Sequence, residues 1–510
     1  MRVQVLIIMF MASAMTTWTQ PLPNRYVEQV FPGYTETSEV LFSTGVPEPN
    51  PGGGFYEFIT GYPLNVNEWD TDPVNLYMDI FEPTGDTLAK RPAIIICFGG
   101  GFLSGSKDHW SIRLLAQELA KRGFVTATID YRLGMNVFDA DLATRAVYRG
   151  LQDGRSAVRF FRADAAGANL YRVDPDQIYI GGHSSGGFIG LHNVYLEHEY
   201  ERPLSTYAWT QDAIPIPDLG CLDCAGNNQA FSGHAQAVFN LAGGLGMTTF
   251  MESANDGPVV LFHSEDDDTV PYGAGTPFAS IIWLVVGADL PDVWGSLPIS
   301  VQAAVLGIPY QFYSYTDRGH AVHEDGSSAL YSDIVPGISE WFDLQFLNPE
   351  AHPLQGDSIV CTYALNKVYS IAPGDAIYFD WQVEGGTFLL QSTAMPFAVV
   401  SWDTLAPSRS ISVTPYNEFA ARGETQTIDI DLVSYDVNQW LGGSGSWADP
   451  AKWSLGHVPL PCQDVVIFNG GAPIIVDIPD GTLARARALY DFGSVILNVG
   501  VGAELRLLID

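Results

Sequence analysis

The hexapeptide Gly182-His183-Ser184-Ser185-Gly186-Gly187 directly follows a short apolar run at residues 177–181. A strand that runs into G-x-S-x-G predicts a sharp strand-to-helix turn, which presents the middle serine at its tip. Small residues flank that serine because such a turn leaves no room for larger side chains. We therefore expect Ser184 to be a nucleophile. The neighbouring Ser185 is the competitor, but it has no glycine two residues before it.

Apolar runs alternate with amphipathic stretches across residues 76–350. The run at 93–98 is wholly apolar, which is typical of a parallel strand buried on both faces. Repeated strand and helix patterns predict an α/β domain with a mostly parallel sheet. Further strands are expected at 124–130, 178–180, 237–241, 259–263 and 310–315, and helices at 110–122, 142–166, 187–197 and 329–346.

Two inserts interrupt this alternation. Residues 198–234 carry several prolines and a C-x-x-C pair, and residues 275–308 are strongly apolar. Both follow strand ends that should face a site at the Ser184 turn. We expect both inserts to form walls or caps over a substrate pocket. The alternative for the second insert is that it only fills the core.

A glycine-rich loop follows the first expected strand. Its sequence is Phe98-Gly99-Gly100-Gly101-Phe102. Three glycines let the backbone approach a substrate closely and point N–H groups at a developing alkoxide. We expect the oxyanion donors to be the backbone N–H groups of Gly100, Gly101 and Ser185. The alternative is a tight loop in which the glycines only pack.

Acidic and imidazole side chains follow the last two expected strands. Three consecutive aspartates occupy positions 266–268, and His320 stands in the loop after the strand at 310–315. Serine, acid and histidine in this chain order suit nucleophilic catalysis, in which the acid orients the histidine. His323 is the competing base, and a cation bound at the acidic run is a further alternative. His183 and His263 are interpreted as structural.

This order of groups is that of the α/β-hydrolase fold, and about residues 70–350 resemble its secreted carboxylesterase branch. Related hydrolases carry H-G-x-x-D-x-x-V-P; aligning His263 and Val270-Pro271 with that motif selects Asp267 from the three aspartates. Their usual H-G-G-G motif has histidine where this chain has Phe98. The resemblance implies ester hydrolysis by Ser184, Asp267 and His320, with no metal or organic cofactor. The other matching segments are residues 75–81, 91–95, 99–102, 130–133 and 174–178.

Short alternating apolar and polar runs at residues 356–434 predict a β-sandwich. The segment resembles the PKD-like, immunoglobulin-type modules of secreted bacterial enzymes. In those modules a second cysteine often follows the strand that here contains Asn417. This chain has Ala420 and Ala421 there, so we expect Cys361 to be free. The matching positions are Cys361, Tyr369, residues 378–386, Val400 and Trp402.

Residues 440–510 resemble the opening of β-helix-like modules in secreted bacterial surface proteins. Their short strands and glycine turns fit a solenoid, although about 70 residues make a short module, which we expect to be truncated. The expected organisation is a signal peptide at 1–19, an α/β-hydrolase domain at 20–352, a sandwich at 356–434 and the β-helix-like module at 440–510.

The first residues are typical of a secretory signal peptide. Met1-Arg2 precedes an apolar stretch that ends near Met15, and cleavage is expected near Thr19/Gln20. The stretch is short for a membrane span, although an uncleaved anchor is the alternative. No other apolar run is long enough to span, so we expect a secreted protein that is extracellular or associated with the cell surface.

The amino-acid composition limits the kinds of partner that the protein can bind. Acidic residues outnumber basic ones 58 to 24, giving a net charge of −34, which disfavours nucleic acid and anionic lipid. Export permits disulfides, and Cys221-Leu-Asp-Cys224 favours a local disulfide or two free thiols over a metal site. Cys97 lies in an apolar strand and is expected to be buried and inert.

The leading hypothesis is a secreted serine carboxylesterase that acts on small-molecule or polymer-linked esters. One alternative is a serine exopeptidase of the same fold, which would require a substrate-gating domain before the hydrolase. A second is an adhesion or polymer-binding protein that carries an esterase domain, such as an acetyl or feruloyl esterase acting on polysaccharide. In that case the C-terminal β modules would attach it to a cell surface or a polysaccharide.

Overall fold

The computed structural model divides the chain into two compact units. The first comprises Met1–Asn348 with Phe419–Ala421, and the second Pro349–Glu418 with Arg422–Asp510. The predicted signal peptide lies outside the described residues. No helix of the described residues is both long and apolar enough to cross a membrane. The structure describes residues 24–53, 63–279, 287–324 and 329–507.

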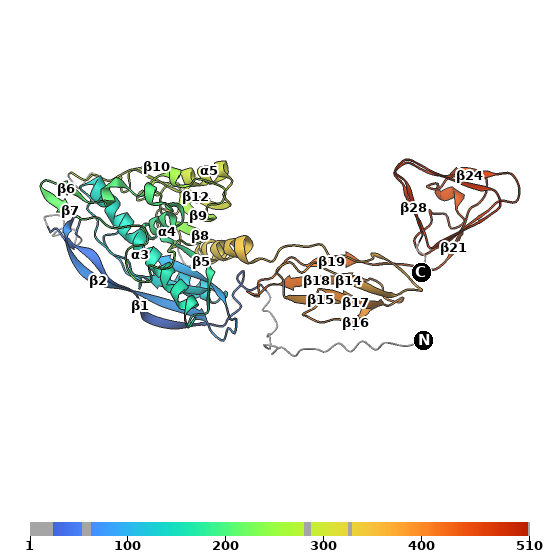
Figure 1. The fold of residues 1–510 in the computed structure, drawn as a ribbon, viewed down its shortest axis with the longest axis horizontal. Helices are drawn as coiled ribbons and strands as arrows, with labels where there is room; N and C mark the ends of the chain where they lie inside the picture. The colour runs from blue at the N-terminus through green and yellow to red at the C-terminus, as the bar shows by residue number, and fades with distance from the viewer. Residues whose placement is uncertain (1–23, 54–62, 280–286, 325–328, 508–510) are drawn as a thin grey trace. The chain divides into compact units, whose positions relative to one another are not determined.

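An eight-stranded sheet forms the centre of the first unit, in the order β1-β2-β4-β3-β5-β8-β9-β12 (Figure 1). Its last six strands are parallel to one another. Every residue of β3 is buried, because helices cover both faces of the sheet. The predicted mostly parallel α/β sheet is confirmed. The six strands are β3 (Arg91–Cys97), β4 (Val125–Ile129), β5 (Val173–His183), β8 (Ala237–Leu241), β9 (Val259–Ser264) and β12 (Tyr310–Tyr315).

Two long antiparallel strands complete one edge of this sheet. Strand β1 (Tyr34–Pro51) pairs with β2 (Val66–Pro83), and β2 pairs antiparallel with β4. Several register shifts interrupt the β1–β2 pairing. Bulges of this kind disturb the strict alternation of buried and exposed side chains, which is the signal from which strands are predicted. The alternation of apolar and polar residues therefore did not predict strands β1 and β2.

Among the described helices, α2, α3, α4 and α7 cover the sheet. Helix α3 contacts α4, and α2 contacts α7. Because right-handed crossovers run from β3 to β4 in one direction and from β4 to β5 in the other, α2 and α3 lie on opposite faces. The Asp139 side chain caps α3 by accepting from the Leu142 N–H at 3.0 Å. The bounds are α2 Trp110–Ala120, α3 Ala140–Ala166, α4 Ser185–Tyr195 and α7 Val335–Phe342, with π-type turns at Leu330–Ile334 and Asp343–Leu347.

The first insert does not wall the pocket at Ser184, contrary to expectation. Two cavities adjoin Ser184, and no described residue of the first insert lines either of them. It packs instead against α3, where Arg145 donates to the carbonyls of Ser205 and Pro217 at 2.8 and 2.7 Å. Buried guanidinium groups need acceptors, and the carbonyls of the insert supply them. The insert contains the short strands β6 (Trp209–Gln211) and β7 (Ile214–Ile216).

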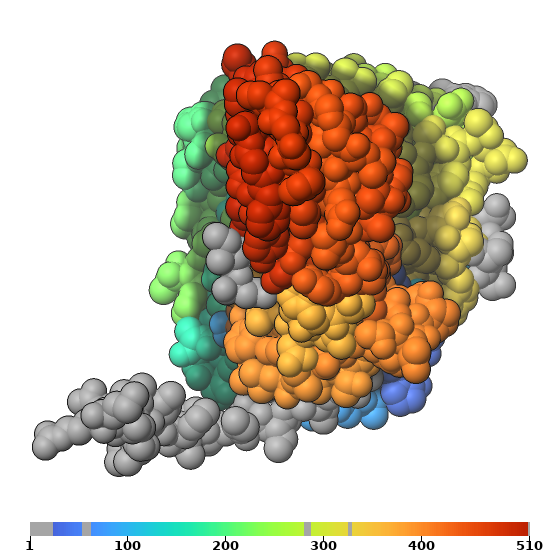
Figure 2. Space-filling view, turned by 90° about the vertical axis from the view of Figure 1, so that its right-hand side faces the viewer, coloured from blue at the N-terminus to red at the C-terminus, as the bar shows by residue number. Residues whose placement is uncertain are grey.

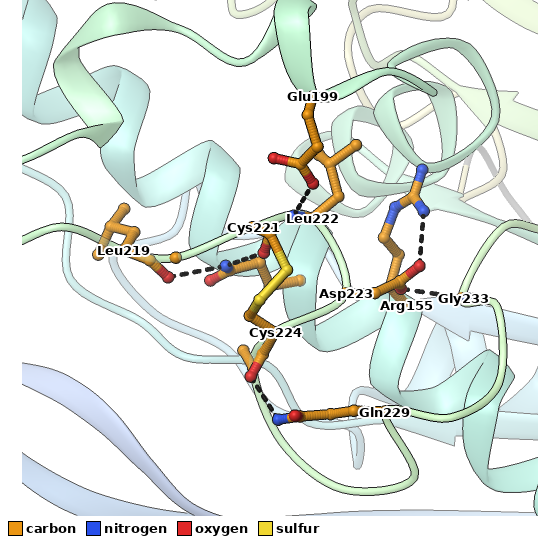
Figure 3. The surroundings of a disulfide bond; sticks show 12 residues. Arg155, Glu199, Leu219, Cys221, Leu222, Asp223, Cys224, Gln229 and Gly233 are labelled. Atoms are coloured by element: carbon orange, nitrogen blue, oxygen red, sulfur yellow. Dashed lines mark hydrogen bonds and ion pairs between the residues drawn. A yellow bond between two sulfur atoms is a disulfide. The ribbon is translucent and has the colours of Figure 1, made fainter.

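A disulfide joins Cys221 and Cys224 within this insert, as one of the two favoured alternatives predicted (Figure 3). The loop around it is held by its neighbours. Asp223 pairs with Arg155 at 3.3 Å and accepts from the Gly233 N–H at 3.1 Å. The Gln229 side chain donates to the carbonyl of Cys224 at 2.5 Å. The disulfide therefore closes a loop that is anchored on α3.

The second insert contributes helix α5 (Ser296–Leu306) and the short pair β10 (Ala274–Gly275) and β11 (Val293–Trp294). The sequence patterns did not predict this helix. Apolar residues lie on all sides of this helix, so its sequence lacks the alternation of apolar and polar faces from which a helix is predicted. Several of them remain exposed, among them Leu297, Val301 and Val305. Residues 280–286 of the expected insert lie outside the described residues.

The second unit begins with two small antiparallel sheets, β14-β17-β16 and β15-β18-β19, around a single apolar core. In that core the Trp402 indole N–H donates to the Tyr369 hydroxyl at 3.1 Å, and this hydroxyl donates to the carbonyl of Asp357 at 3.0 Å. The strands are β13 (Ile359–Cys361), β14 (Asn366–Ser370), β15 (Tyr378–Glu384), β16 (Gly386–Leu390), β17 (Phe397–Trp402), β18 (Ser410–Tyr416), β19 (Gln426–Asp429) and β20 (Asp431–Val433).

The expectation that Cys361 is free is wrong. Cys361 forms a disulfide with Cys462, 101 residues further along the chain. The expectation rested on the lack of a nearby partner, and the partner comes from the following segment. Cys97 is free and fully buried in β3, as expected, and burial raises the pKa of its thiol.

The final segment folds into three short parallel sheets, β21-β23-β26, β22-β24-β27 and β25-β28. Figure 1 shows them as the sides of a triangle, and Figure 2 shows their outer surface, in orange to red, as a closely packed block. Trp440, Trp447 and Trp453 fill the inside. The strands are β21 (Val437–Gln439), β22 (Gly445–Ser446), β23 (Asp464–Phe468), β24 (Ile474–Ile478), β25 (Leu483–Ala486), β26 (Ala488–Phe492), β27 (Val495–Val499) and β28 (Glu504–Leu507).

Candidate active site

Ser184 lies on the turn between β5 and α4. Its backbone has φ 52° and ψ −118°, a region that a non-glycine residue seldom adopts. The flanking glycines are sterically required, because a Cβ at Gly182 or Gly186 would lie 2.1 or 2.2 Å from the carbonyl oxygen of Cys97. The turn therefore packs directly on the end of β3. The side chain of Ser184 reaches the wall of a cavity.

The three-glycine loop after β3 lines that same cavity, together with Ser184 and His320. Gly100 and Gly101 have φ values of 138° and 62°, which favour glycine. A Cβ on Gly100 would lie 2.0 Å from the carbonyl oxygen of Ser104. Ser185 begins α4, so its backbone N–H belongs to the first turn of that helix. The glycine loop and the start of α4 thus lie next to Ser184.

Phe98 takes the position that histidine holds in the related motif, and its ring packs behind the loop. It stacks on Tyr131, with 4.1 Å between ring centroids. The Tyr131 hydroxyl donates to the carbonyl of Phe98 at 3.0 Å and lies 3.0 Å from the hydroxyl of Ser185. Tyr131 thus ties the glycine loop to the start of α4. Sequence reasoning did not single out this tyrosine, although it lies in the matched segment 130–133 directly after β4.

Asp267 and His320 lie side by side. The Nδ1 of His320 is 2.8 Å from Oδ2 of Asp267. The other carboxylate oxygen accepts from the backbone N–H groups of Thr269 and Val270 at 2.8 and 3.0 Å. Burial alone would raise the pKa of Asp267, but hydrogen bonds from His263 and His320 outweigh it and hold this pKa well below its ordinary value. The carboxylate is therefore an anion that faces His320.

The competing residues make other contacts. Asp266 accepts from the Ser264 hydroxyl at 2.5 Å and from the Gly319 N–H at 2.9 Å, so it holds the loop that leads to His320. Asp268 is exposed and accepts from the Thr269 hydroxyl at 3.1 Å. His323 is buried against the Ser111 hydroxyl at 3.0 Å, and burial lowers its pKa to about 3. No described group of three or more metal-ligating side chains is arranged to hold a metal ion.

His183, inside the turn, supports the loop that carries His320. Its Nε2 lies 3.1 Å from the carbonyl oxygen of His320, and the two rings are 4.8 Å apart. A carbonyl only accepts, so Nε2 is the donor. Burial is the main cause that lowers the pKa of His183 well below its ordinary value, and His183 is neutral. The predicted structural role fits this contact.

Two cavities of different character meet at Ser184. The larger, of about 570 Å³, has a mixed lining, in which Leu103 and Ile112 lie beside the polar His109, Glu324 and Thr269. The smaller, of about 50 Å³, is lined almost wholly by apolar side chains. The second insert provides much of that lining, as predicted for its described residues. The residues it contributes are Pro277, Phe278, Leu290, Pro291 and Val293.

Comparison with known proteins finds similarity between part of the first unit and ester hydrolases. Residues 78–281 match the BD-FAE family model. A neuroligin-like protein, glit-1, of Caenorhabditis elegans is 32% identical over 30% of this chain and 20% of its own length. A probable isoprenylcysteine alpha-carbonyl methylesterase of Oryza sativa subsp. japonica is 24% identical over 56% of this chain and 72% of its own length. The chain thus spans about a fifth of the nematode relative.

Among solved structures, apo Thermogutta terrifontis esterase 2 aligns over 54% of this chain and 92% of its own, with 21% identity and a TM-score of 0.38. The family match and the relatives named as esterases support a carboxylic ester hydrolase. The mostly parallel sheet fits the α/β-hydrolase fold.

Proposed function

We propose that the protein is a secreted serine carboxylesterase that acts through an acyl-enzyme. The observation that carries this proposal is the 2.8 Å contact between Asp267 and His320, at the cavity that Ser184 and the glycine loop also line. Ser184 is the nucleophile, His320 the general base and then the general acid, and Asp267 orients His320.

In the proposed reaction these residues act in turn. His320 takes the Ser184 hydroxyl proton through Nε2, while its Nδ1–H remains bonded to Asp267. The serine oxygen attacks the ester carbonyl, and the backbone N–H groups of Gly100, Gly101 and Ser185 stabilise the oxyanion. His320 then protonates the departing alcohol. Water, activated by His320, hydrolyses the acyl-enzyme and releases the carboxylic acid.

The two cavities favour a short acyl group and a larger alcohol. A water-sized group needs roughly 10–15 Å³ of cavity volume, so the apolar cavity of about 50 Å³ holds about four such groups. This is enough room for an acetyl to butyryl chain. The other cavity is more than ten times larger and suits the alcohol side. A sugar hydroxyl in a polysaccharide is an alcohol of this kind.

Replacement of Ser184 tests the proposal directly. The Ser184→Ala variant should lose p-nitrophenyl acetate hydrolysis by about 10⁶-fold in kcat, because no acyl-enzyme can form. It should also lose labelling by a fluorophosphonate probe. Ser38→Ala, which changes an exposed serine on β1, is the matched control and should keep both activities. Hydrolysis at the wild-type rate by Ser184→Ala would refute the proposal.

The acyl preference is tested with p-nitrophenyl esters of two to ten carbons. We expect kcat/KM to be highest for acetyl to butyryl esters. Phe278 lines both cavities, and Phe278→Ala should move the optimum to longer chains by enlarging the apolar one. An unchanged optimum in this variant, or a wild-type optimum at eight or more carbons, would contradict the assignment of the small cavity to the acyl group.

The same proposal includes export and attachment. The Val3–Met15 apolar run supports a signal peptide, and the two disulfides suit an oxidising compartment. Mature protein recovered from culture medium should begin near Gln20. A full-length N-terminus on secreted protein would contradict cleavage.

Attachment to polysaccharide through the PKD-like and β-helix-like modules is the second role. Phe468 and Phe492 favour it, because they lie in register on β23 and β26 and are 66% and 54% exposed. Exposed aromatic faces on neighbouring strands are suited to pack on sugar rings. The Phe468→Ala/Phe492→Ala double variant should then sediment less with insoluble polysaccharide while hydrolysing p-nitrophenyl acetate normally. Equal sedimentation of both proteins would rule out this surface.

A further inference from the structure

His263 contacts the same carboxylate oxygen as His320. Its ring lies fully buried at the end of β9, with Nε2 3.0 Å from Oδ2 of Asp267 and 3.1 Å from the carbonyl oxygen of Val270. The carbonyl oxygen of Val270 and the ionised carboxylate of Asp267 can only accept hydrogen bonds, so Nε2 must carry the hydrogen. The partners therefore select one tautomer of this imidazole.

The other ring nitrogen agrees with that assignment. The backbone N–H of Ser296, in the first turn of α5, donates to Nδ1 of His263 at 3.4 Å. The Ser296 hydroxyl also lies 3.0 Å from Nδ1 and accepts from the Asn240 side chain at 3.1 Å. Nδ1 is thus an acceptor, and His263 donates through Nε2 toward Asp267. This chain of contacts links the second insert to the carboxylate.

Asp267 is consequently bonded through both oxygens. Oδ1 accepts from two backbone N–H groups, and Oδ2 accepts from His263 and His320. A carboxylate with these four donors has no easy rotation about its terminal bond, because any turn breaks at least two hydrogen bonds. The orientation that receives the His320 Nδ1–H is the one that His263 also supports.

We propose that His263 is a positioning residue for the reaction: its Nε2–H holds the Asp267 carboxylate in the orientation that receives the Nδ1–H of His320. The inference rests on the proposed roles of Ser184, Asp267 and His320. It assigns to His263 an effect on the rate of the chemical steps and none on substrate binding, because His263 is buried behind Asp267 and lines neither cavity.

Two substitutions separate this role from a merely structural one. In His263→Asn the shorter amide can still meet Ser296 in place of Nδ1 but cannot reach Asp267. In His263→Gln the amide N–H₂ can reach the position of Nε2. A lost hydrogen bond to a charged group corresponds to about 10- to 100-fold, so kcat on p-nitrophenyl acetate should fall by that factor in His263→Asn. KM should stay within about threefold, and His263→Gln should recover most of kcat.

Three further readouts make the experiment decisive. Titration with a fluorophosphonate counts competent Ser184 sites, so kcat is expressed per folded site even where His263→Asn lowers the yield. A low-field proton resonance from the His320–Asp267 bond should move in His263→Asn and return toward wild type in His263→Gln. His192→Gln, which removes another buried imidazole, should lower stability while leaving kcat per site unchanged.

Each outcome bears on one hypothesis. Wild-type kcat per site in His263→Asn, or equal losses in His263→Asn and His263→Gln with no movement of the resonance, would overturn the role of His263. Activity in Ser184→Ala would instead overturn the proposed function on which that role rests.

Discussion

The two units bury different kinds of groups. The described core of the first unit contains paired charges, among them Arg145, Arg149 and Glu68, all at most 2% exposed. In the second unit the described buried residues include no arginine or lysine, and its cores are built from aromatic and aliphatic side chains. Its long-range cross-link is covalent, through Cys361 and Cys462.

This contrast follows from size. A large core can enclose ions together with most of their partners, whereas a thin sandwich or a short coil of strands buries less surface to offset the loss of hydration. The buried Asp464 of the second unit accordingly pairs with Arg487, which stays 27% exposed. The first unit can therefore hold a carboxylate such as Asp267 at fixed orientation behind a cavity. The second unit presents surface and is stabilised by a cross-link that costs no buried charge.

Removal of that cross-link should have the largest effect on stability. In the chain-entropy model a loop of about 100 residues contributes about 4–5 kcal/mol, so Cys361→Ser/Cys462→Ser should lose up to this free energy of unfolding in the second unit. Calorimetry should show a lower transition for that unit only, with ester hydrolysis unchanged.

The matched control is Cys221→Ser/Cys224→Ser, because that disulfide closes a separation of three residues. The same model gives it a much smaller effect. If the two double variants were destabilised equally, loop length would not be the source of the stabilisation.

Breaking the buried ion pairs should destabilise the first unit almost as much. Glu68 accepts from Arg145 at 2.8 Å and from Arg149 at 2.6 Å. Burial would raise the pKa of Glu68, but Arg149 and Arg145 hold it below its ordinary value. Glu68→Gln would leave two buried cations uncompensated, at a cost of about 3–5 kcal/mol. Urea unfolding followed by ester hydrolysis should report this loss, and a change below 1 kcal/mol would show that water reaches the pairs.

The sequence patterns predicted the parts of the first unit that depend on neighbouring residues. The wholly apolar run at 93–98 predicted β3, and the turn chemistry around Ser184 predicted a strand-to-helix junction that the structure contains. Chain order with the family motif led to Asp267 and His320, which the structure brings into contact.

The patterns failed where a contact joins segments far apart in the chain. Nothing local to Cys361 points to Cys462, since the pairing depends on how the last segment folds. Phe98 stacks on Tyr131, which follows another strand. The sequence around His263 indicates only a buried histidine, because its contact with Asp267 depends on the fold. Such contacts require the tertiary fold.

A buried histidine should make the first unit sensitive to acid. His192 donates through Nδ1 to the carbonyl of Phe188 at 2.8 Å, and Nε2 accepts from the Gly246 N–H at 3.1 Å. Burial lowers its pKa to about 4 from an ordinary value of 6.5. The unfolded chain therefore takes up this proton below pH 6.5 while the folded one does not. As a result, the free energy of unfolding falls by about 1.4 kcal/mol for each pH unit down to about pH 4.

His192→Gln isolates this contribution. The variant should be less stable than wild type at pH 7, and the gap should narrow by about 2 kcal/mol between pH 6.5 and pH 5, since only wild type loses the histidine contribution. Urea unfolding at both pH values measures it. A gap that stays constant would mean that His192 takes up its proton equally in both states. The described residues of the second unit bury no histidine, so its transition should not follow this dependence.

The smallest effect is expected for an ion pair at the surface of the second unit. Lys367 and Asp357 are 2.9 Å apart, but their side chains are 23% and 61% exposed, so water screens the attraction. Asp357→Asn should therefore change the free energy of unfolding by less than about 1 kcal/mol, and less still in high salt. The comparison with Glu68→Gln uses the same carboxylate-to-amide change in the two units. A loss of 3 kcal/mol or more at Asp357 would mean that the second unit, too, depends on its ion pairs, and the contrast between the units would then lie only in how deeply the charges are placed.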